Sequence, residues 1–105
     1  MKARHDIRNW NPSIYEVHTD TGRDTIIVSG RDRWALEQLI GAETTGCTPI
    51  DNPAPRWSAY VHNLRGMGVE IETIHEKHNG PFPGAHARYV LRSEVTRRIG
   101  EGEAA

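Results

Sequence analysis

The sequence predicts a single α+β domain at residues 25–99, in which helices are followed by a β-hairpin. Two patterns support this prediction. The apolar residues of segment 56–65 recur at the spacing of an amphipathic helix, whereas those of segment 69–73 alternate with polar residues as in a half-buried strand. The chain has 105 residues, which fits one domain with short tails.

The domain is expected to begin with a short strand and a helix. Residues 25–28 form the β-branched run Thr-Ile-Ile-Val, which is typical of a strand. Ser29 can cap a helix that begins near Gly30 and ends near Gly41. The apolar stripe of this helix consists of Trp34, Leu36, Leu39 and Ile40.

Two further helices are predicted after Gly46. Thr48 suits an N-cap and Pro49 suits the first helical position, while Pro53 ends this helix after about one turn. A longer helix follows over residues 55–66. Its apolar residues stand at i, i+3, i+4 and i+7, and they are Trp57, Tyr60, Val61 and Leu64.

A hairpin and a last short helix complete the domain. The alternation in residues 69–74 predicts a strand, residues 77–84 are rich in turn formers, and residues 87–92 predict the returning strand. Residues 93–99 can form a short final helix. No period persists in residues 1–24, which we therefore interpret as an N-terminal arm, flexible or docked on its own domain or on a partner. Residues 100–105 are predicted to be a disordered tail.

This order of elements is the plan of a winged helix-turn-helix domain. A strand and three helices, the middle one very short, are followed by a hairpin that closes the open side of a three-helix core and whose loop is the wing. The core is expected to contain Trp34, Leu39, Trp57, Tyr60, Val61, Leu64 and Ile71.

Composition excludes several classes of protein. No run of about 18 apolar residues exists to span a membrane. The single cysteine, Cys47, cannot form an internal disulfide, and a cytoplasmic protein is the simplest interpretation. The formal net charge is -1, whereas DNA-binding domains usually carry a basic surplus. Segment 54–92 is mildly basic, with five Lys or Arg residues and three carboxylates.

No enzymatic or cofactor motif is present. The chain lacks a phosphate-binding Gly-Lys loop, a nucleophile elbow and a clear pair of catalytic carboxylates, so we expect a non-enzyme without cofactors. His75, His78 and His86 flank the wing, but their spacing matches no metal-binding motif. We therefore expect no metal site.

Four segments carry a resemblance to a known family: residues 48–51, 56–65, 68–73 and 87–91. Between Arg31 and Leu91 they resemble the small winged-helix domains of phage and prophage proteins. The long wing with Gly80-Pro81-Phe82-Pro83-Gly84 departs from the short polar turn common there. The resemblance implies DNA binding by a transcriptional regulator or a DNA-processing accessory.

In a winged helix, the helix over 55–66 would enter the major groove and the wing would contact the DNA backbone. The polar face of this helix offers Arg56, Ser58, Ala59, His62, Asn63 and Arg65, types that suit base and phosphate contacts. The wing adds Lys77, His78, Asn79 and Arg88. The alternative is that these polar side chains only solvate the open face of an amphipathic helix.

A second functional hypothesis is a protein-interaction module that does not bind DNA. Winged helices also serve as interaction modules, and fold alone does not settle function. The near-neutral charge favours this alternative, as do three aromatic residues outside the predicted core, Trp10, Tyr15 and Phe82. A host defence or transcription component is the kind of partner implied, and a homodimer is another possible assembly.

Overall fold

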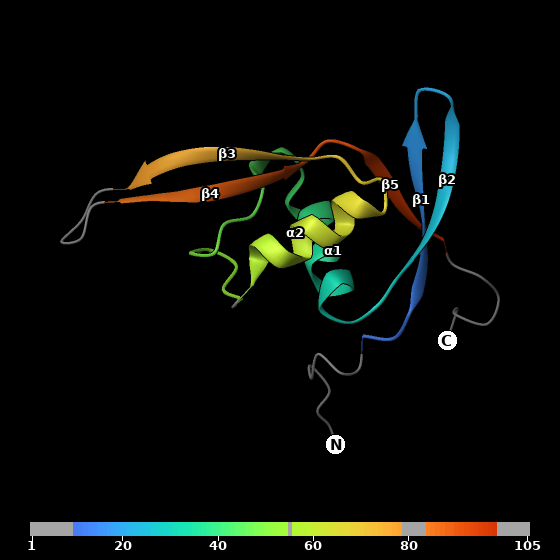
Figure 1. Ribbon diagram of the computed structural model, residues 1–105, viewed down its shortest axis with the longest axis horizontal. Helices are drawn as coiled ribbons and strands as arrows, with labels where there is room; N and C mark the ends of the chain where they lie inside the picture. The colour runs from blue at the N-terminus through green and yellow to red at the C-terminus, as the bar shows by residue number, and fades with distance from the viewer. Residues whose placement is uncertain (1–9, 55, 79–83, 99–105) are drawn as a thin grey trace, which may run out of the picture.

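The computed structural model describes residues 10–54, 56–78 and 84–98. Its strands are β1 (Ser13–Thr19), β2 (Gly22–Val28), β3 (Ile71–His78), β4 (Gly84–Leu91) and β5 (Glu94–Arg98). Its helices are α1 (Gly30–Ala42), the 3-10 helix η2 (Glu43–Thr45) and α2 (Trp57–Gly66). A three-stranded sheet of order β2-β1-β5 and the hairpin β3-β4 stand at opposite ends of the molecule, with the two α-helices between them (Figure 1).

The α+β class is confirmed, but the three-helix core is wrong. The described residues contain two α-helices, α1 and α2. Between them, the N–H of Asn52 donates to the carbonyl of Thr48 at 2.8 Å, and the N–H of Asp51 donates to Thr48 Oγ1 at 2.9 Å. Thr48 therefore caps a single turn, as its side chain predicts. Pro53 lacks an N–H, so the turn does not extend into a helix.

The N-terminal segment forms a strand at the centre of a sheet. β1 pairs antiparallel with β2 along its whole length and with β5 on its other side, so residues 13–19 of the segment interpreted as an arm are docked on their own domain. Its alternate residues Ser13, Tyr15 and Val17 are buried. The sequence pattern is weak because the opposite face of β1 is itself half-buried.

The predicted final helix is also wrong, because residues 94–98 form β5. Val95 lies opposite Val17 of β1 and is buried, which favours the extended form of this β-branched residue. The β3-β4 hairpin is longer than predicted on both sides of its loop. The loop residues 79–83 and the predicted tail 100–105 lie outside the described residues.

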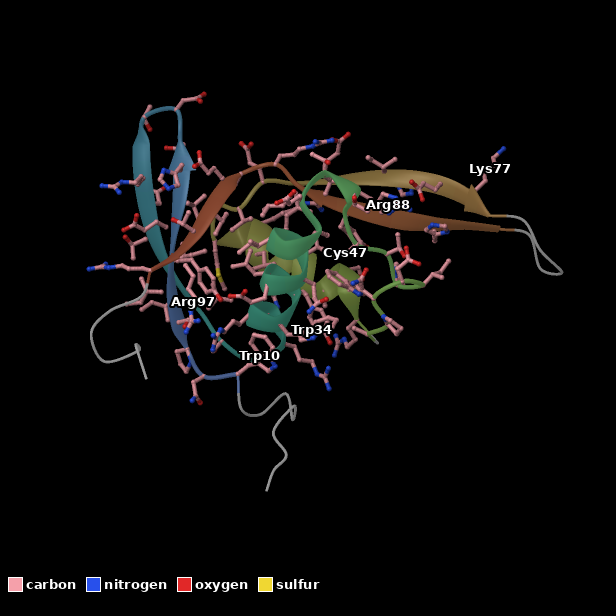
Figure 2. The ribbon with its side chains drawn as sticks, turned by 180° about the vertical axis from the view of Figure 1, so that it is seen from behind. Trp10, Trp34, Cys47, Lys77, Arg88 and Arg97 are labelled. Atoms are coloured by element: carbon pink, nitrogen blue, oxygen red, sulfur yellow. The ribbon has the colours of Figure 1, made fainter. Side chains whose placement is uncertain are left out.

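Cys47 adds a third, one-residue strand to the hairpin. Its N–H and carbonyl exchange hydrogen bonds of 2.8 Å with the carbonyl and N–H of Tyr89 on β4. Figure 2 shows Cys47 between the helices and the base of the hairpin. This pairing ties the segment after α1 to the wing sheet.

Aromatic rings join the helices to the hairpin. Trp57 of α2 stacks on Tyr89 of β4 with ring centroids 5.8 Å apart, and it meets Trp34 of α1 at 5.5 Å and Tyr60 at 6.4 Å. Trp34 is half-buried, whereas the other predicted core residues are buried: Leu39, Trp57, Tyr60, Val61, Leu64 and Ile71.

Candidate nucleic-acid interface

The exposed side of α2 is the first part of the candidate interface. The apolar residues of α2 are buried against α1 and the hairpin, which leaves the opposite side in solvent. Arg56, Ser58 and His62 are exposed there, and Ala59 is half-buried. No Asp or Glu occurs in α2. This helix therefore offers small, polar and basic side chains without a carboxylate that would repel phosphate.

Two predicted base-contacting residues are instead bonded to neighbouring elements. Asn63 Nδ2 donates to both carboxylate oxygens of Asp32 on α1, at 3.2 and 3.3 Å. On the other flank of α2, Arg65 donates from Nε and Nη2 to the Ile71 carbonyl at 3.1 and 2.6 Å, and from Nη2 to Thr73 Oγ1 at 2.8 Å. In this structure, Asn63 and Arg65 hold α2 between α1 and β3.

The predicted wing residues are separated along the hairpin (Figure 2). Lys77 is exposed towards the far end of β3. Arg88 is half-buried near the helices, where Nη1 donates to the Thr45 carbonyl at 2.9 Å. His78 is the last residue of β3, and Asn79 lies outside the described residues.

Ion pairs within the hairpin neutralise part of its positive charge. Arg88 Nε donates to Glu76 Oε2 at 2.6 Å, and His86 Nε2 lies 3.1 Å from Glu76 Oε1. These bonds hold the pKa of Glu76 below its usual value, and the bond to Glu76 raises the pKa of Arg88. Arg92 is paired with Glu72 in the same way. Of the cations predicted for the interface, Arg56, Arg65 and Lys77 have no ion pair to described residues, and Arg65 is bonded to uncharged oxygens of β3.

The hairpin register decides which side chains can act with α2. Opposite residues of antiparallel strands share a face, so His75 and Lys77 lie on the same face as Tyr89, which stacks on α2. His86 is opposite Glu76 and lies on the other face. His75, weighed from the sequence only as a metal ligand, is thus a candidate contact. His75 and Lys77 are two residues apart on one strand and therefore share a face, and this spacing is the sequence signal that could have identified His75 as a contact.

The histidines flanking the wing do not form a cluster in the part of the chain that the structure describes. His75 and His86 point to opposite faces of the hairpin, because they pair with Ala87 and Glu76. Within those residues, no three His, Cys, Asp or Glu residues form a group suited to a metal ion.

The residues predicted to bind a protein partner lie in different environments. Trp10 is half-buried, with the Arg33 guanidinium 5.0 Å from its ring centroid. Tyr15 is fully buried, and its hydroxyl donates a short hydrogen bond to Glu37, so it cannot contact a partner. Phe82 lies outside the described residues. Ile50 was not predicted as a contact, and it is 58% exposed.

The fold agrees with the comparison with known protein families. No described helix is both long and apolar enough to cross a membrane. No curated protein and no solved structure matches the chain. A family model described as a winged helix domain matches residues 25–101, which is more than half of the 105 residues. The chain therefore belongs to the winged helix domain family.

Proposed function

We propose that this protein binds double-stranded DNA and inserts α2 into the major groove. The observation that carries the proposal is the exposed side of α2, which has no carboxylate. Winged-helix domains commonly place the helix before the hairpin in the groove and the wing beside it. The small surplus of basic residues in segment 54–92 implies modest affinity, since phosphate neutralisation provides much of the binding free energy.

The exposed stripe of α2 suits close approach to base edges. Ser58 and Ala59 are small, so the helix backbone can lie deep in the groove, and Ala59 can touch a thymine methyl group. His62 lies one turn further on and can contact a base edge. Arg56, at the start of the helix, can pair with a guanine or a phosphate. In this proposal Asn63 and Arg65 position α2.

The wing supplies backbone contacts in the same proposal. Lys77 and His75 lie on the face of the hairpin that α2 shares. Arg88, bonded to Glu76 and Thr45, supports the base of the wing. The protein would act by binding alone, as a transcriptional regulator or a DNA-processing accessory. The phage or prophage setting rests on the resemblance of the sequence.

Fluorescence anisotropy with a mixed library of duplex DNA tests this proposal. Binding should weaken steeply as salt concentration rises, because cations on the protein displace condensed counterions. Arg56→Ala and His62→Ala should weaken binding, whereas Arg98→Ala should not, since Arg98 is an exposed arginine on β5 at the far end of the molecule. No binding at low salt, or an equal loss in all three variants, would refute the proposed interface.

One exposed apolar segment favours a protein partner as the second candidate function. Ile50 is exposed together with Pro53 on the loop before α2. No Lys or Arg occurs in residues 48–54, so this loop offers an apolar anchor without positive charge. A host protein captured by the wild type and by Arg56→Ala, but not by Ile50→Asp, would support this function. Phe82→Ala and Trp10→Ala extend the test to the aromatic residues predicted from the sequence.

A further inference from the structure

The two edges of the three-stranded sheet differ in their chemistry. β5 carries Glu94, Arg97 and Arg98. The β2 edge ends in residues 25–28, Thr-Ile-Ile-Val, which contain neither a charge nor a proline. Natural sheets usually protect their edges with charged residues or proline, because an edge strand presents unpaired N–H and carbonyl groups. β2 is the outermost strand in both views, at the end opposite the wing (Figures 1 and 2).

The end of β2 is apolar on both faces. Ile27 is 64% exposed and lies opposite the half-buried Ile14 of β1 on the face turned away from the core. Ile26 lies on the core face opposite Tyr15 and is half-buried. A strand added beyond β2 would therefore cover apolar side chains on both faces and pair with the backbone groups on the side of β2 that faces no other described strand.

We propose that β2 pairs antiparallel with β2 of a second copy of this chain, so that two sheets become one of six strands. A two-fold axis normal to the sheet passes midway between one residue and its equivalent in the second copy, so that these two residues face each other. An axis at Arg23 or Asp24 would place like charges opposite each other, which is destabilising. An axis at Thr25 would place Arg23 and Asp24 opposite isoleucines.

The axis at Ile26 places no like charges opposite each other, and it leaves only one charged residue, Asp24, opposite an apolar residue, Val28. Ile26 then faces Ile26 of the second copy, and Thr25 faces Ile27 of the second copy, which are favourable β-branched pairs. The pairing extends over residues 24–28 and ends before α1 begins at Gly30. The wing stands at the opposite end of the molecule, and α2 lies between the wing and the three-stranded sheet (Figure 1). The dimer does not depend on the proposed DNA binding.

Sedimentation equilibrium of the full chain without DNA tests the dimer. We expect the wild type to dimerise across the micromolar range, Ile27→Glu to be monomeric, and Ile50→Glu to dimerise like the wild type. Ile50 is the matched control because it is the other exposed large hydrophobic residue of the described part. Circular dichroism checks that each variant is folded. A monomeric wild type, or a dimeric folded Ile27→Glu variant, would overturn the proposal.

Cysteine cross-linking tests the register. Opposite residues of antiparallel strands have Cα atoms about 4.5–5.5 Å apart, within reach of a disulfide. Ile26→Cys should form a covalent dimer on mild oxidation, whereas Thr25→Cys should not, because Thr25 does not face its own equivalent. The native Cys47 is buried and does not compete. Cross-linking of Thr25→Cys but not Ile26→Cys would overturn this register, and cross-linking of neither would contradict the pairing of the strands.

Discussion

Gly46 allows the chain to approach the edge of β4. A Cβ atom at this position would lie 2.6 Å from the Tyr89 carbonyl oxygen and 2.9 Å from Cγ2 of Val90. The residue also has a φ of +75°, which residues with a side chain disfavour. The paired hydrogen bonds between Cys47 and Tyr89 follow directly after it. The connection from α1 to the wing sheet thus depends on the absence of a side chain here.

Gly46→Ala should therefore lower the free energy of unfolding by about 2–3 kcal/mol. Gly41→Ala is the matched control, because Gly41 lies inside α1 and a Cβ atom added there would meet nothing within 4 Å. Gly41→Ala should raise the free energy of unfolding by a few tenths of a kcal/mol up to about 1 kcal/mol. Urea denaturation measures both variants, and a similar effect of the two would contradict the close approach.

Two buried acids make stability sensitive to alkaline pH. Burial raises the pKa of the Cys47 thiol from 9.0 to about 11, and burial with the Glu37 hydrogen bond raises the pKa of Tyr15 from 10.0 to about 12. For each group, at a pH between its ordinary pKa and its raised pKa in the folded protein, the unfolded chain has released a proton that the folded chain keeps. The free energy of unfolding should therefore fall as pH rises above about 9.

Urea midpoints measured across this pH range test the prediction. Cys47→Ala should make the fall shallower between pH 9 and 11, since it removes one of the two groups. The fall between pH 10 and 12 that Tyr15 causes should remain. A wild type whose stability does not change with alkaline pH would contradict the burial of these groups.

At the scale of the element, α2 is held on both flanks by polar side chains. Asn63 connects it to Asp32 on α1, and Arg65 connects it to Ile71 and Thr73 on β3. Because the Arg65 guanidinium donates to a main-chain carbonyl, its bonds fix the helix relative to the backbone of the strand. The orientation of the proposed recognition helix thus depends on residues that do not need to touch DNA.

Arg65→Ala should lower the free energy of unfolding by about 1 kcal/mol, because charged hydrogen bonds to β3 are lost. It should leave the salt dependence of DNA binding near that of the wild type. Arg56→Ala should leave the free energy of unfolding near that of the wild type. It should reduce the slope of log affinity against log salt concentration by about one, because one phosphate contact is lost. Denaturation and anisotropy on the same two variants separate the roles. A reduced slope in Arg65→Ala would show that Arg65 contacts phosphate directly.

At the scale of the whole molecule, the N-terminal strand is part of the core. The family match begins at residue 25, yet β1 lies between β2 and β5, and Tyr15 and Val17 are buried. Gly30 N–H also donates to the Trp10 carbonyl at 2.8 Å, where the Ser29 side chain makes no cap bond. The matched region therefore leaves out one strand of the three-stranded sheet.

Removal of residues 1–24 should accordingly unfold the protein or cause it to aggregate, because β2 and β5 lose their shared partner and the core loses two buried apolar side chains, Tyr15 and Val17. Near-ultraviolet circular dichroism and thermal unfolding compare this fragment with the full chain. A cooperatively folded 25–105 fragment would contradict the role of β1.

Sequence patterns predicted the elements whose apolar faces are one-sided. Helical spacing predicted α2, through Trp57, Tyr60, Val61 and Leu64. Alternation of apolar and polar residues after Val69 predicted β3. The site was predicted only in part. Arg56, Ser58 and His62 are exposed as expected, whereas Asn63, Arg65 and Arg88 bond to partners 6 to 43 residues away in the sequence. Such bonds depend on which elements become neighbours, and no local pattern encodes that.

The sequence by itself therefore determined the helices α1 and α2, the hairpin and the polar side of α2, because hydrophobic periodicity and glycine or proline positions are local properties. Only the tertiary structure decided that β1 is the central strand of a sheet, that residues 94–98 are a strand, and that Arg65 and Arg88 are tied to the fold. The physical reason is that strand pairing joins residues far apart in the chain. Val95 becomes a strand residue because Val17, 78 residues earlier, lies opposite it.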